Sequence, residues 1–566
     1  AHFKKTSTEY AYRRYNHTLN KKSIEKAIEK LMGYLDGLRS IAKSGSDIQL
    51  LRDDLFNSCT KNGNNPQGIY TLSAPTGAGK TLAMLAFALT HAKKHNLSRI
   101  IFVLPFLNII EQVARVYKNV IGHSDPELTI LEDHSLTETQ EDSALKYLAE
   151  NWDAPIIITT TIKLFESLFA NKSTSCRRLH NIANSIILFD EAQTMPVGLA
   201  APTLVALKEL NKNYGCTIVF STATQPAFDA LDEQIKKYTQ DRWETRELVP
   251  KELNLFERAK RVDVKWHREP ISWSELIQQI KKEPQVLTVV NLRKHAQDIY
   301  KLMLDAELEG IFHLSTNMCP KHRLYVLDEV KKCLENERFC RLVATQCIEA
   351  GVDLDFPVVY RAFAPLEAIV QAAGRCNRNG KKRKGLVHVI KPTNDNERYP
   401  TKDYELATVE VQKLLIEKGN IDISSPEMLK EYYENYFSII SMGERSKKLY
   451  HAIKAYEFPE VARLYRWIPN AGMNILVPYK PYIDDFDYLT EKARNGEIDF
   501  NWLQKARLLS VNIIPKKDSD LTNYLEPIRD RKGIDTGWYI LLNSQVYTEK
   551  TGLDMEFSNL DDYCLV

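Results

Sequence analysis

The sequence has few of the features that mark secreted, disulfide-rich or membrane proteins. Its nine cysteines are an odd number without a CxxC pair, which argues against a disulfide framework and against a zinc site. No apolar run approaches the roughly 18 residues that spanning a bilayer requires. The N-terminal stretch AHFKKTSTEYAYRRYNH lacks the apolar core of a secretory signal. We therefore expect a soluble, cytoplasmic protein with no membrane partner.

Net charge excludes little, because the formal value is only +2. Local basic clusters do occur: residues 1–30 carry eight Lys or Arg against three Glu, and RNGKKRK (378–384) carries five basic residues and no acid. Such runs fit a polyanion contact or simply a solvated surface. Because the chain begins with Ala rather than Met, we expect a processed or truncated chain with something missing upstream.

Length and hydrophobic patterning predict several domains of the α/β class. A chain of 566 residues exceeds one ordinary core, and domains of roughly 150 residues would give about three or four units. Short β-rich runs alternate with helical patterns, which predicts parallel sheets buried on both faces. The first series of runs lies at 69–74, 99–105, 155–161, 185–190 and 217–223, and the second at 285–291, 310–316, 341–347, 357–362 and 385–392.

The two series divide the chain into four predicted regions. An amphipathic helical pattern over 21–51 precedes the first series, and a charged stretch at 236–261 separates the two. Beyond about residue 440 the sequence is aromatic and irregular, without a catalytic motif. The predicted regions are a helical linker at 1–50, α/β domains at 51–250 and 251–440, and a smaller C-terminal domain at 441–566.

A phosphate-binding loop is predicted in SAPTGAGKT, between a strand and the helix that begins near Lys80. Its glycines let the backbone wrap a phosphate, the lysine reaches the terminal phosphates of ATP, and the threonine offers a hydroxyl to Mg²⁺. A plain Gly-rich turn would leave the adjacent Lys-Thr pair unexplained. The expected nucleotide-binding residues are Thr76, Gly77, Ala78, Gly79, Lys80 and Thr81.

Two adjacent acids, Asp190 and Glu191, end a strand in IILFDEAQTMP. Alone, they fit a solvated strand end. Beside a P-loop they fit a hydrolytic site, with Asp190 holding Mg²⁺ and Glu191 polarising the attacking water. The stretch FSTAT (220–224) ends the next strand with hydroxyls, which is weak evidence because Ser and Thr commonly cap strands and helices.

The second series supplies arginines. QAAGRCNRNG spaces Gln371, Arg375 and Arg378 by four and three, which on a helix places them on one face. Arginines delivered across a cleft can neutralise charge on a transferring phosphate, whereas the alternative is a surface basic helix. Just upstream, ATQCIEAGVDLD contains Thr345 and Asp353 in a strand–loop setting.

In this order the motifs resemble those of superfamily 2 helicases: A-x-x-G-x-G-K-T, DEAQ, STAT, T-Q-x-x-E-x-G-V-D and Q-x-x-G-R-x-x-R. GIYTLSAPTGAGKTLAMLAFALTHA, VLPFLNIIEQ, STATQPAF and APLEAIVQAAGRCNRNG narrow the resemblance to the helicase of type I CRISPR systems, over roughly residues 45–400. That resemblance implies two RecA-like domains and an accessory domain in a prokaryotic protein. It also implies ATP-driven 3′-to-5′ translocation on the single-stranded DNA that a Cascade surveillance complex and its guide RNA displace in an R-loop.

The resemblance also assigns roles to residues. It implies nucleotide and Mg²⁺ binding at Lys80 and Thr81, and hydrolysis at Asp190 and Glu191. It implies γ-phosphate sensing at Arg375 and Arg378. Gln371 belongs to the same motif, and Asp353 is expected at the nucleotide. Pro105, Thr160 and Thr345 stand where the family contacts the DNA backbone. Near Arg52 there is no convincing glutamine motif for adenine recognition.

One family element has no counterpart in the sequence. Its HD nuclease is marked by an adjacent His-Asp pair, and no such dipeptide occurs here. We therefore expect no metal nuclease in this chain, and a nuclease either as a separate HD subunit or upstream of Ala1. A lone histidine such as His134 is interpreted as structural.

Two other functions stay open from the sequence. One is an RNA helicase or another DNA translocase, which contacts to the 2′-OH would distinguish. The other is an ATP-dependent assembly switch that clamps a partner without translocating.

Overall fold

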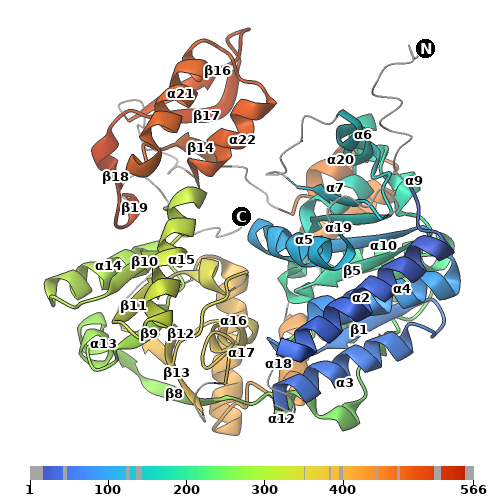
Figure 1. The fold of residues 1–566 in the computed structure, drawn as a ribbon, viewed down its shortest axis with the longest axis horizontal. Helices are drawn as coiled ribbons and strands as arrows, with labels where there is room; N and C mark the ends of the chain where they lie inside the picture. Colours follow the sequence, from blue (N-terminus) through green and yellow to red (C-terminus); the bar gives the residue numbers. More distant parts are fainter. Residues whose placement is uncertain are drawn as a thin grey trace. The chain divides into compact units, whose positions relative to one another are not determined.

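The computed structural model describes residues 17–41, 47–122, 128–134, 143–349, 351–380, 384–393, 399–439, 444–467, 472–514 and 524–554. The basic residues before 17 and residues 381–383 of RNGKKRK lie outside this set. The chain forms two compact units (Figure 1), and each is described by itself. The first unit comprises Ala1–Lys260 and Ser424–Trp467, and the second Arg261–Ile423 and Ile468–Val566.

The first unit is built on a seven-stranded sheet with strand order β3-β4-β2-β5-β6-β1-β7, in which all neighbours run parallel. The strands are β1 (Ile69–Ser73), β2 (Arg99–Leu104), β3 (Ile130–Asp133), β4 (Ile156–Thr160), β5 (Ser185–Asp190), β6 (Thr217–Thr222) and β7 (Arg246–Glu247). The five runs predicted from sequence all form strands. The prediction missed β3 and β7, because both lie at sheet edges and carry charged residues instead of a continuous apolar run.

Helices surround this sheet. They are α2 (Lys21–Ile41), α3 (Asp47–Asn62), α4 (Lys80–His95), α5 (Leu107–Ile121), α6 (Ser143–Asn151), α7 (Thr161–Leu168), α8 (Ser173–Cys176), α9 (Leu179–Ile182), α10 (Val197–Asn213), α11 (Asp232–Thr239) and α12 (Leu255–Arg258). The helical pattern predicted at 21–51 therefore corresponds to α2 and the start of α3. Helix α2 buries Ile24, Ala27 and Leu31 and packs against α4 and α5, so it is part of the first unit.

A later segment of the chain returns to the first unit. Its helices are α18 (Pro426–Ile439), α19 (Glu444–Lys454) and α20 (Phe458–Leu464). Aromatic stacking joins it to the earlier residues: the rings of Tyr450 and Tyr238 have centroids 3.4 Å apart, and those of Tyr465 and Phe169 are 3.7 Å apart. The aromatic residues noted beyond about residue 440 thus divide between the two units.

The second unit holds a six-stranded parallel sheet in the order β10-β11-β9-β12-β13-β8. Its strands are β8 (Val262–Ile271), β9 (Gln285–Val289), β10 (Ile311–Leu314), β11 (Cys340–Ala344), β12 (Val358–Ala362) and β13 (Gly385–Pro392). The helices are α13 (Trp273–Ile280), α14 (Arg293–Asp305), α15 (Pro320–Glu335), α16 (Leu366–Ala373) and α17 (Lys402–Lys418). The prediction missed only β8 among these strands, because charged and aromatic residues alternate along this edge strand.

The C-terminal residues form a smaller part of the second unit. A four-stranded sheet in the order β15-β14-β17-β16 uses β14 (Met473–Leu476), β15 (Ser510–Ile513), β16 (Leu525–Arg529) and β17 (Asp535–Leu541). It packs with α21 (Ile483–Arg494) and α22 (Phe500–Leu508) around Trp502 and Trp538. The predicted α/β class, two parallel sheets plus a smaller C-terminal part, is confirmed. None of the helices in the described ranges is both long and apolar enough to cross a bilayer.

Two buried histidines bond to residues distant in the sequence, one in each unit. In the first, His91 contacts the Gly63 carbonyl and the Thr217 hydroxyl, each at 2.9 Å. In the second, His322 contacts the hydroxyl of Tyr547 at 2.9 Å and so ties α15 to the C-terminal part. Burial lowers the pKa of each histidine to about 4.

We predict that these histidines make the protein acid-sensitive. Their stabilising contribution is present above pH 6.5, the unfolded value, and is lost as the pH falls through about 4, because the unfolded chain then binds more protons. His322→Gln should flatten the fall in unfolding free energy between pH 7.5 and 5, by at most about 3 kcal/mol. Denaturant titrations at both pH values measure this, with the exposed His451→Gln as control. Equal slopes for the His322 variant and the unmodified protein would contradict the prediction.

Candidate active site

The loop between β1 and α4 forms a cradle of backbone amides. Gly77 and Gly79 adopt φ angles of 79° and 85°, in the left-handed region that favours glycine. Lys80 begins α4, and its Nζ donates to the carbonyl of Ala74 at 3.1 Å. Arg52 of α3 donates from Nε to the Gly77 carbonyl at 3.2 Å, so this side chain supports the loop. No sequence motif indicated that contact.

The remaining predicted nucleotide residues lie in the same loop and helix. Thr76 is half-buried and Ala78 is buried. Thr81 stands in the first turn of α4, where its carbonyl accepts a hydrogen bond from the hydroxyl of Tyr117 at 3.1 Å. Burial, and after it the negative charge of Asp190, raises the pKa of Tyr117 well above its usual value. The structure therefore places both Thr81 and Asp190 near one buried tyrosine.

Asp190 is the last residue of β5, and its carboxylate is held by neighbouring donors. Oδ1 accepts from the Glu191 backbone N–H at 3.1 Å and from the Ser221 hydroxyl at 3.2 Å. Burial, followed by the charge of Glu191, raises the pKa of Asp190 to about 6, while Lys80 and these two donors act in the opposite direction. The structure thus brings the lysine of the P-loop and the predicted acid pair to one end of one sheet.

Gln193 connects the acid pair to the FSTAT stretch. Its Nε2 donates to Glu191 Oε2 at 2.6 Å, while its Oε1 accepts from the hydroxyl of Thr222. Thr222 Oγ1 also accepts from the backbone N–H of Thr224 at 2.9 Å. Gln193 had no predicted role. Its signal was the fourth letter of DEAQ, an amide that can donate to a carboxylate and accept from a hydroxyl at once.

Two residues predicted to contact the DNA backbone lie at the carboxyl ends of neighbouring β-strands. Pro105 follows β2, and Thr160 ends β4, where it pairs with Leu104. Thr160 also caps α7, because its Oγ1 accepts from the Lys163 backbone N–H at 3.0 Å. Pro105 and Thr160 therefore lie at the same edge of the first sheet. Thr345 belongs to the second unit, where it is fully buried and its hydroxyl contacts Cys347 Sγ at 3.5 Å.

In the second unit, the predicted arginines hold the loop that carries Asp353. Arg378 Nε forms an ion pair with Asp353 Oδ1 at 2.8 Å. Arg375 is buried, and it donates from Nε to the Ile348 carbonyl at 3.1 Å and from Nη2 to the Glu349 carbonyl at 2.5 Å. Both arginines are thus held by residues of their own unit: Ile348, Glu349 and Asp353.

The prediction that Gln371, Arg375 and Arg378 share one helix face is wrong. Helix α16 ends at Ala373, so only Gln371 lies on it, half-buried. The backbone of the following residues pairs instead with Phe356: the Arg375 carbonyl accepts from Phe356 N–H, and Asn377 N–H donates to the Phe356 carbonyl, each at 2.9 Å. Helical spacing failed here because this bridge satisfies the backbone groups that would otherwise extend the helix.

A buried ion pair lies beneath the same loop. Arg361 of β12 is fully buried, and its Nη2 lies 3.0 Å from Glu349 Oε1. The guanidinium also donates to Asn291 Oδ1 and to the Tyr404 hydroxyl, each at 2.7 Å. Burial raises the pKa of Glu349 to about 7, and the charges of Arg361 and then Arg375 oppose that rise. Arg361 was not among the predicted site residues, although a lone arginine in the apolar run PVVYRA indicates a buried partner.

The described residues supply no metal cluster of the usual histidine-rich kind. No group of three or more His, Cys, Asp or Glu side chains within the described ranges is arranged to hold a metal ion. The predicted Mg²⁺ residues, Thr81 and Asp190, are both oxygen donors, which is the ligand chemistry that Mg²⁺ prefers. Mg²⁺ commonly takes only one or two carboxylates and fills its other positions with water and phosphate oxygens.

We predict that Gln193→Ala slows ATP hydrolysis at saturating ATP by about tenfold or more, because Glu191 loses the amide that orients it. The KM for ATP should change little, since Gln193 has no contact with the P-loop among its described hydrogen bonds. A steady-state ATPase assay measures both quantities. Gln67→Ala is a matched control, because Gln67 bonds to Gly215 at the opposite end of the same sheet. An unchanged kcat in Gln193→Ala would contradict the prediction.

We further predict that Arg361→Leu lowers the free energy of unfolding by about 3–5 kcal/mol, because it leaves Glu349 buried without its partner. The loss should be smaller at pH 6 than at pH 8, since an unpaired Glu349 with a raised pKa takes up a proton as the pH falls. Denaturation at both pH values measures the difference. Adding Glu349→Gln to Arg361→Leu should recover stability at pH 8, and a double variant less stable than the single one would contradict this account.

Comparisons with known proteins agree with these two units. Residues 53–232 match the family model for DEAD/DEAH box helicases. Residues 282–381 match the C-terminal model of the CRISPR-associated nuclease/helicase Cas3. A CRISPR-associated nuclease/helicase Cas3 from Methanothermobacter thermautotrophicus is 25% identical over 467 residues, which cover 74% of this chain and 54% of the relative. The chain thus spans about half the length of this curated relative.

Solved structures show the same fold. The crystal structure of T. fusca Cas3 with AMPPNP has a TM-score of 0.64 at 15% identity, and the match covers 92% of this chain and 71% of that one. A chain of a CRISPR RNA-guided surveillance complex in a pre-nicking state has a TM-score of 0.58 at 15% identity, covering 88% and 68%. The two parallel sheets correspond to two RecA-like domains. With a helicase model matched in the first unit and a Cas3 model in the second, the chain resembles the helicase of type I CRISPR systems, of the Cas3 kind.

Proposed function

We propose that this chain is an ATP-dependent single-stranded DNA translocase of CRISPR interference. It would move 3′ to 5′ along the displaced strand of a Cascade R-loop and unwind target DNA for degradation. One observation carries the proposal furthest: Gln193 bonds to both Glu191 and Thr222, beside a carboxylate, Asp190, that Lys80 influences. Gln193 thereby connects the proposed hydrolytic carboxylate of Glu191 to Thr222 at the end of β6. A translocating motor needs a connection of this kind to transmit its nucleotide state to the rest of the protein.

The first unit provides the groups for nucleotide hydrolysis. The amides of the Gly77–Gly79 loop and the Lys80 ammonium would bind the phosphates of ATP. Thr81 and Asp190 would hold Mg²⁺, which supplies positive charge to the phosphate oxygens when it is bound. The pKa of about 6 at Asp190 leaves its carboxylate mostly ionised at neutral pH and therefore able to bind a cation. Glu191, held by Gln193, would orient and polarise the attacking water.

The second unit would contribute to charge stabilisation during hydrolysis. Arg375 and Arg378 are proposed to sense the γ-phosphate, with Gln371 from the same motif and Asp353 at the nucleotide. Of the two arginines, Arg378 is the better placed to bind an anion, because the side chain of Asp353, with which it forms an ion pair, is 72% exposed and such a pair exchanges partners at little cost. Arg375 is tied to buried carbonyl groups instead. We therefore expect Arg378 to contact phosphate and Arg375 to position the loop.

The proposed partners follow from the resemblance. Structures named for Cas3 with ADP or AMPPNP support ATP as the nucleotide, and the relative in a surveillance complex supports a Cascade-type partner with guide RNA. Pro105, Thr160 and Thr345 are the proposed contacts to single-stranded DNA. A nuclease would come from an HD domain outside the described chain or from a separate subunit.

We predict that Lys80→Ala abolishes ATP hydrolysis and strand displacement, because the terminal phosphates lose their cation. The test is an ATPase assay with single-stranded DNA or RNA of the same sequence, together with displacement of a labelled strand. The unmodified protein should be stimulated by DNA more than by RNA, and Lys94→Ala, near the far end of α4, should match it. Stronger stimulation by RNA would indicate an RNA helicase. Hydrolysis without any displacement would indicate an assembly switch, and a near-normal rate for Lys80→Ala would overturn the site.

A further inference from the structure

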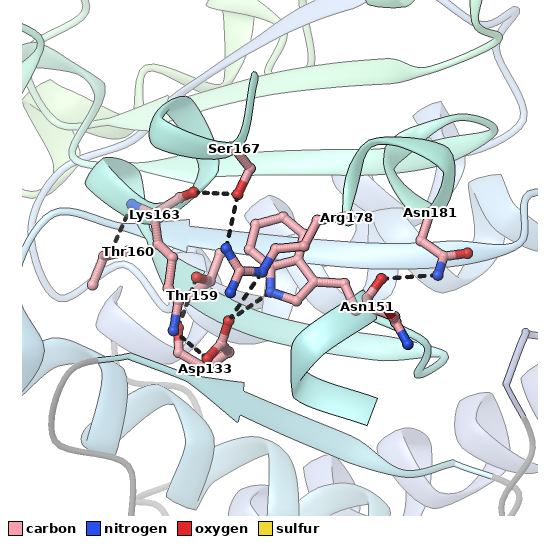
Figure 2. Close-up of polar contacts among 9 residues, drawn as sticks. Asp133, Asn151, Thr159, Thr160, Lys163, Ser167, Arg178 and Asn181 are labelled. Carbon is pink, nitrogen blue, oxygen red and sulfur yellow. Dashed lines mark hydrogen bonds and ion pairs between the residues drawn. The ribbon is translucent and has the colours of Figure 1, made fainter. Parts of the chain in front are cut away.

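Asp133, at the end of β3, is the centre of a polar cluster outside the nucleotide site. Its Oδ2 accepts a hydrogen bond from Trp152 Nε1 at 2.6 Å, and its Oδ1 accepts from Lys163 Nζ. Arg178 Nε lies 3.8 Å from Oδ2. Figure 2 shows Lys163 of α7 and Arg178 of the segment that follows α7 converging on the carboxylate. One acidic side chain therefore holds two cations and an indole.

The cluster closes into a ring around α7. Arg178 Nη1 donates to the Ser167 hydroxyl at 3.2 Å, and that hydroxyl donates to the Lys163 carbonyl at 2.8 Å (Figure 2). The Lys163 backbone N–H donates in turn to Thr160 Oγ1, the cap of the helix. Lys163 near the start of this short helix and Ser167 near its end are thus both connected to Asp133, and the backbone N–H of the same Lys163 donates to the Thr160 cap.

The opposite face of α7 is packed against aromatic rings. Phe165 stacks on Trp467 with ring centroids 5.4 Å apart. Just after the helix, Phe169 stacks on Tyr465. Stacked rings therefore pack this side of α7, and polar contacts hold the side that carries Lys163. Among the described contacts, the hydrogen bond between Asp133 and Lys163 joins the start of α7 to β3, the strand beside β4.

The charges of the cluster do not cancel. Lys163 and Arg178 share the single carboxylate of Asp133, and their side chains keep exposures of 28% and 16%. A second acid, Glu166, is half-buried; burial raises its pKa, while Lys163, Arg466 and Arg178 act against that rise. Lys163, Arg178 and Arg466 thus gather near Asp133 and Glu166, and Lys163 keeps an exposed surface that can attract a polyanion.

We propose that Asp133 is a positioning residue for the binding of single-stranded DNA. It holds the Lys163 ammonium and the Thr160 hydroxyl where both contact a phosphate of the DNA backbone. This inference rests on the proposed function and adds a residue to its proposed site for single-stranded DNA. An ammonium has three N–H donors, so Lys163 can bind Asp133 and a phosphate together. Ammonium and hydroxyl groups are ligands of phosphate and carry no base preference, so the contact is independent of sequence.

The direction of the effect distinguishes positioning from simple charge. If Asp133 acted only as a negative charge near DNA, Asp133→Asn would strengthen strand binding, because one more cation would be uncompensated. If Asp133 positions Lys163, the same substitution weakens binding. The neighbouring Glu132 gives a matched control. Its side chain points to the opposite face of β3 from Asp133 and pairs with Lys118. Glu132→Gln therefore removes an equal charge without removing a contact of Asp133, Lys163, Ser167 or Arg178.

The experiment measures binding of a labelled poly-dT oligonucleotide by fluorescence anisotropy and stimulation of ATP hydrolysis by the same oligonucleotide. We expect Asp133→Asn to raise both the Kd and the half-stimulating DNA concentration about tenfold, equivalent to about 1.4 kcal/mol, while the KM for ATP changes less than about twofold. Lys163→Met should weaken binding similarly. It should also lower the slope of log Kd against log salt concentration by about one. Because Asp133 acts through Lys163, the double variant should bind no more weakly than Lys163→Met.

The outcomes separate this inference from the function on which it rests. Unchanged or tighter DNA binding by Asp133→Asn, or additive losses in the double variant, would overturn the positioning role while leaving the translocase proposal intact. An equal loss in Glu132→Gln would also overturn it, because that result would reflect general destabilisation. Absence of any DNA binding or stimulation in the unmodified protein would refute both proposals.

Discussion

The buried carboxylate of Asp190 is the group on which the first unit's chemistry depends. A carboxylate placed at the end of an apolar strand, next to a second acid, is costly unless other groups stabilise its charge. Here the Glu191 backbone N–H, the Ser221 hydroxyl and the nearby Lys80 oppose the rise in its pKa. Each donor comes from a different motif, so the need to stabilise one charge draws separate parts of the sequence to one point.

The second unit also contains a buried acid, Glu349, and its charge is stabilised by an arginine of the same unit, Arg361. Glu349 is buried below the loop that carries Asp353, and Arg361 neutralises it with support from Asn291 and Tyr404. The backbone of the same loop receives the side chain of Arg375. In both units, then, a buried acid lies beside a loop that carries residues with proposed roles. The difference is that Asp190 is proposed to bind an external cation, Mg²⁺, whereas the cation that pairs with Glu349 is Arg361 of the same chain.

Patterning in the sequence was sufficient to predict the two sheets but not their edges. Strands buried on both faces, such as β2 and β5, are continuous apolar runs and are readily recognised. The edge strands β3, β7 and β8 carry charges that pair with neighbouring helices or strands, so their sequences resemble loops. For the same reason, residues such as Asp133 were not considered as members of a site.

Local motifs predicted which residues gather in the first unit better than in the second. The P-loop and the acid pair are short segments whose spacing matches the backbone they adopt. The arginine segment failed as a helix because its backbone pairs with Phe356, some twenty residues away in sequence, and no local rule contains that contact. Gln193 and Arg361 depend on similar long-range partners, Thr222 and Glu349. Their side-chain types signalled a need for partners without identifying them.

The return of residues 424–467 to the first unit has a consequence for how the chain can be divided. The polypeptide crosses between the units after Lys260, after Ile423 and after Trp467, so three covalent connections join them. A fragment cut at the first crossing would carry the P-loop and the acid pair, but it would expose the rings of Phe169 and Tyr238 to water. The nucleotide-binding half of this protein is therefore not a contiguous segment, and a soluble version of it would need its last helices supplied through a fused linker or by co-expression.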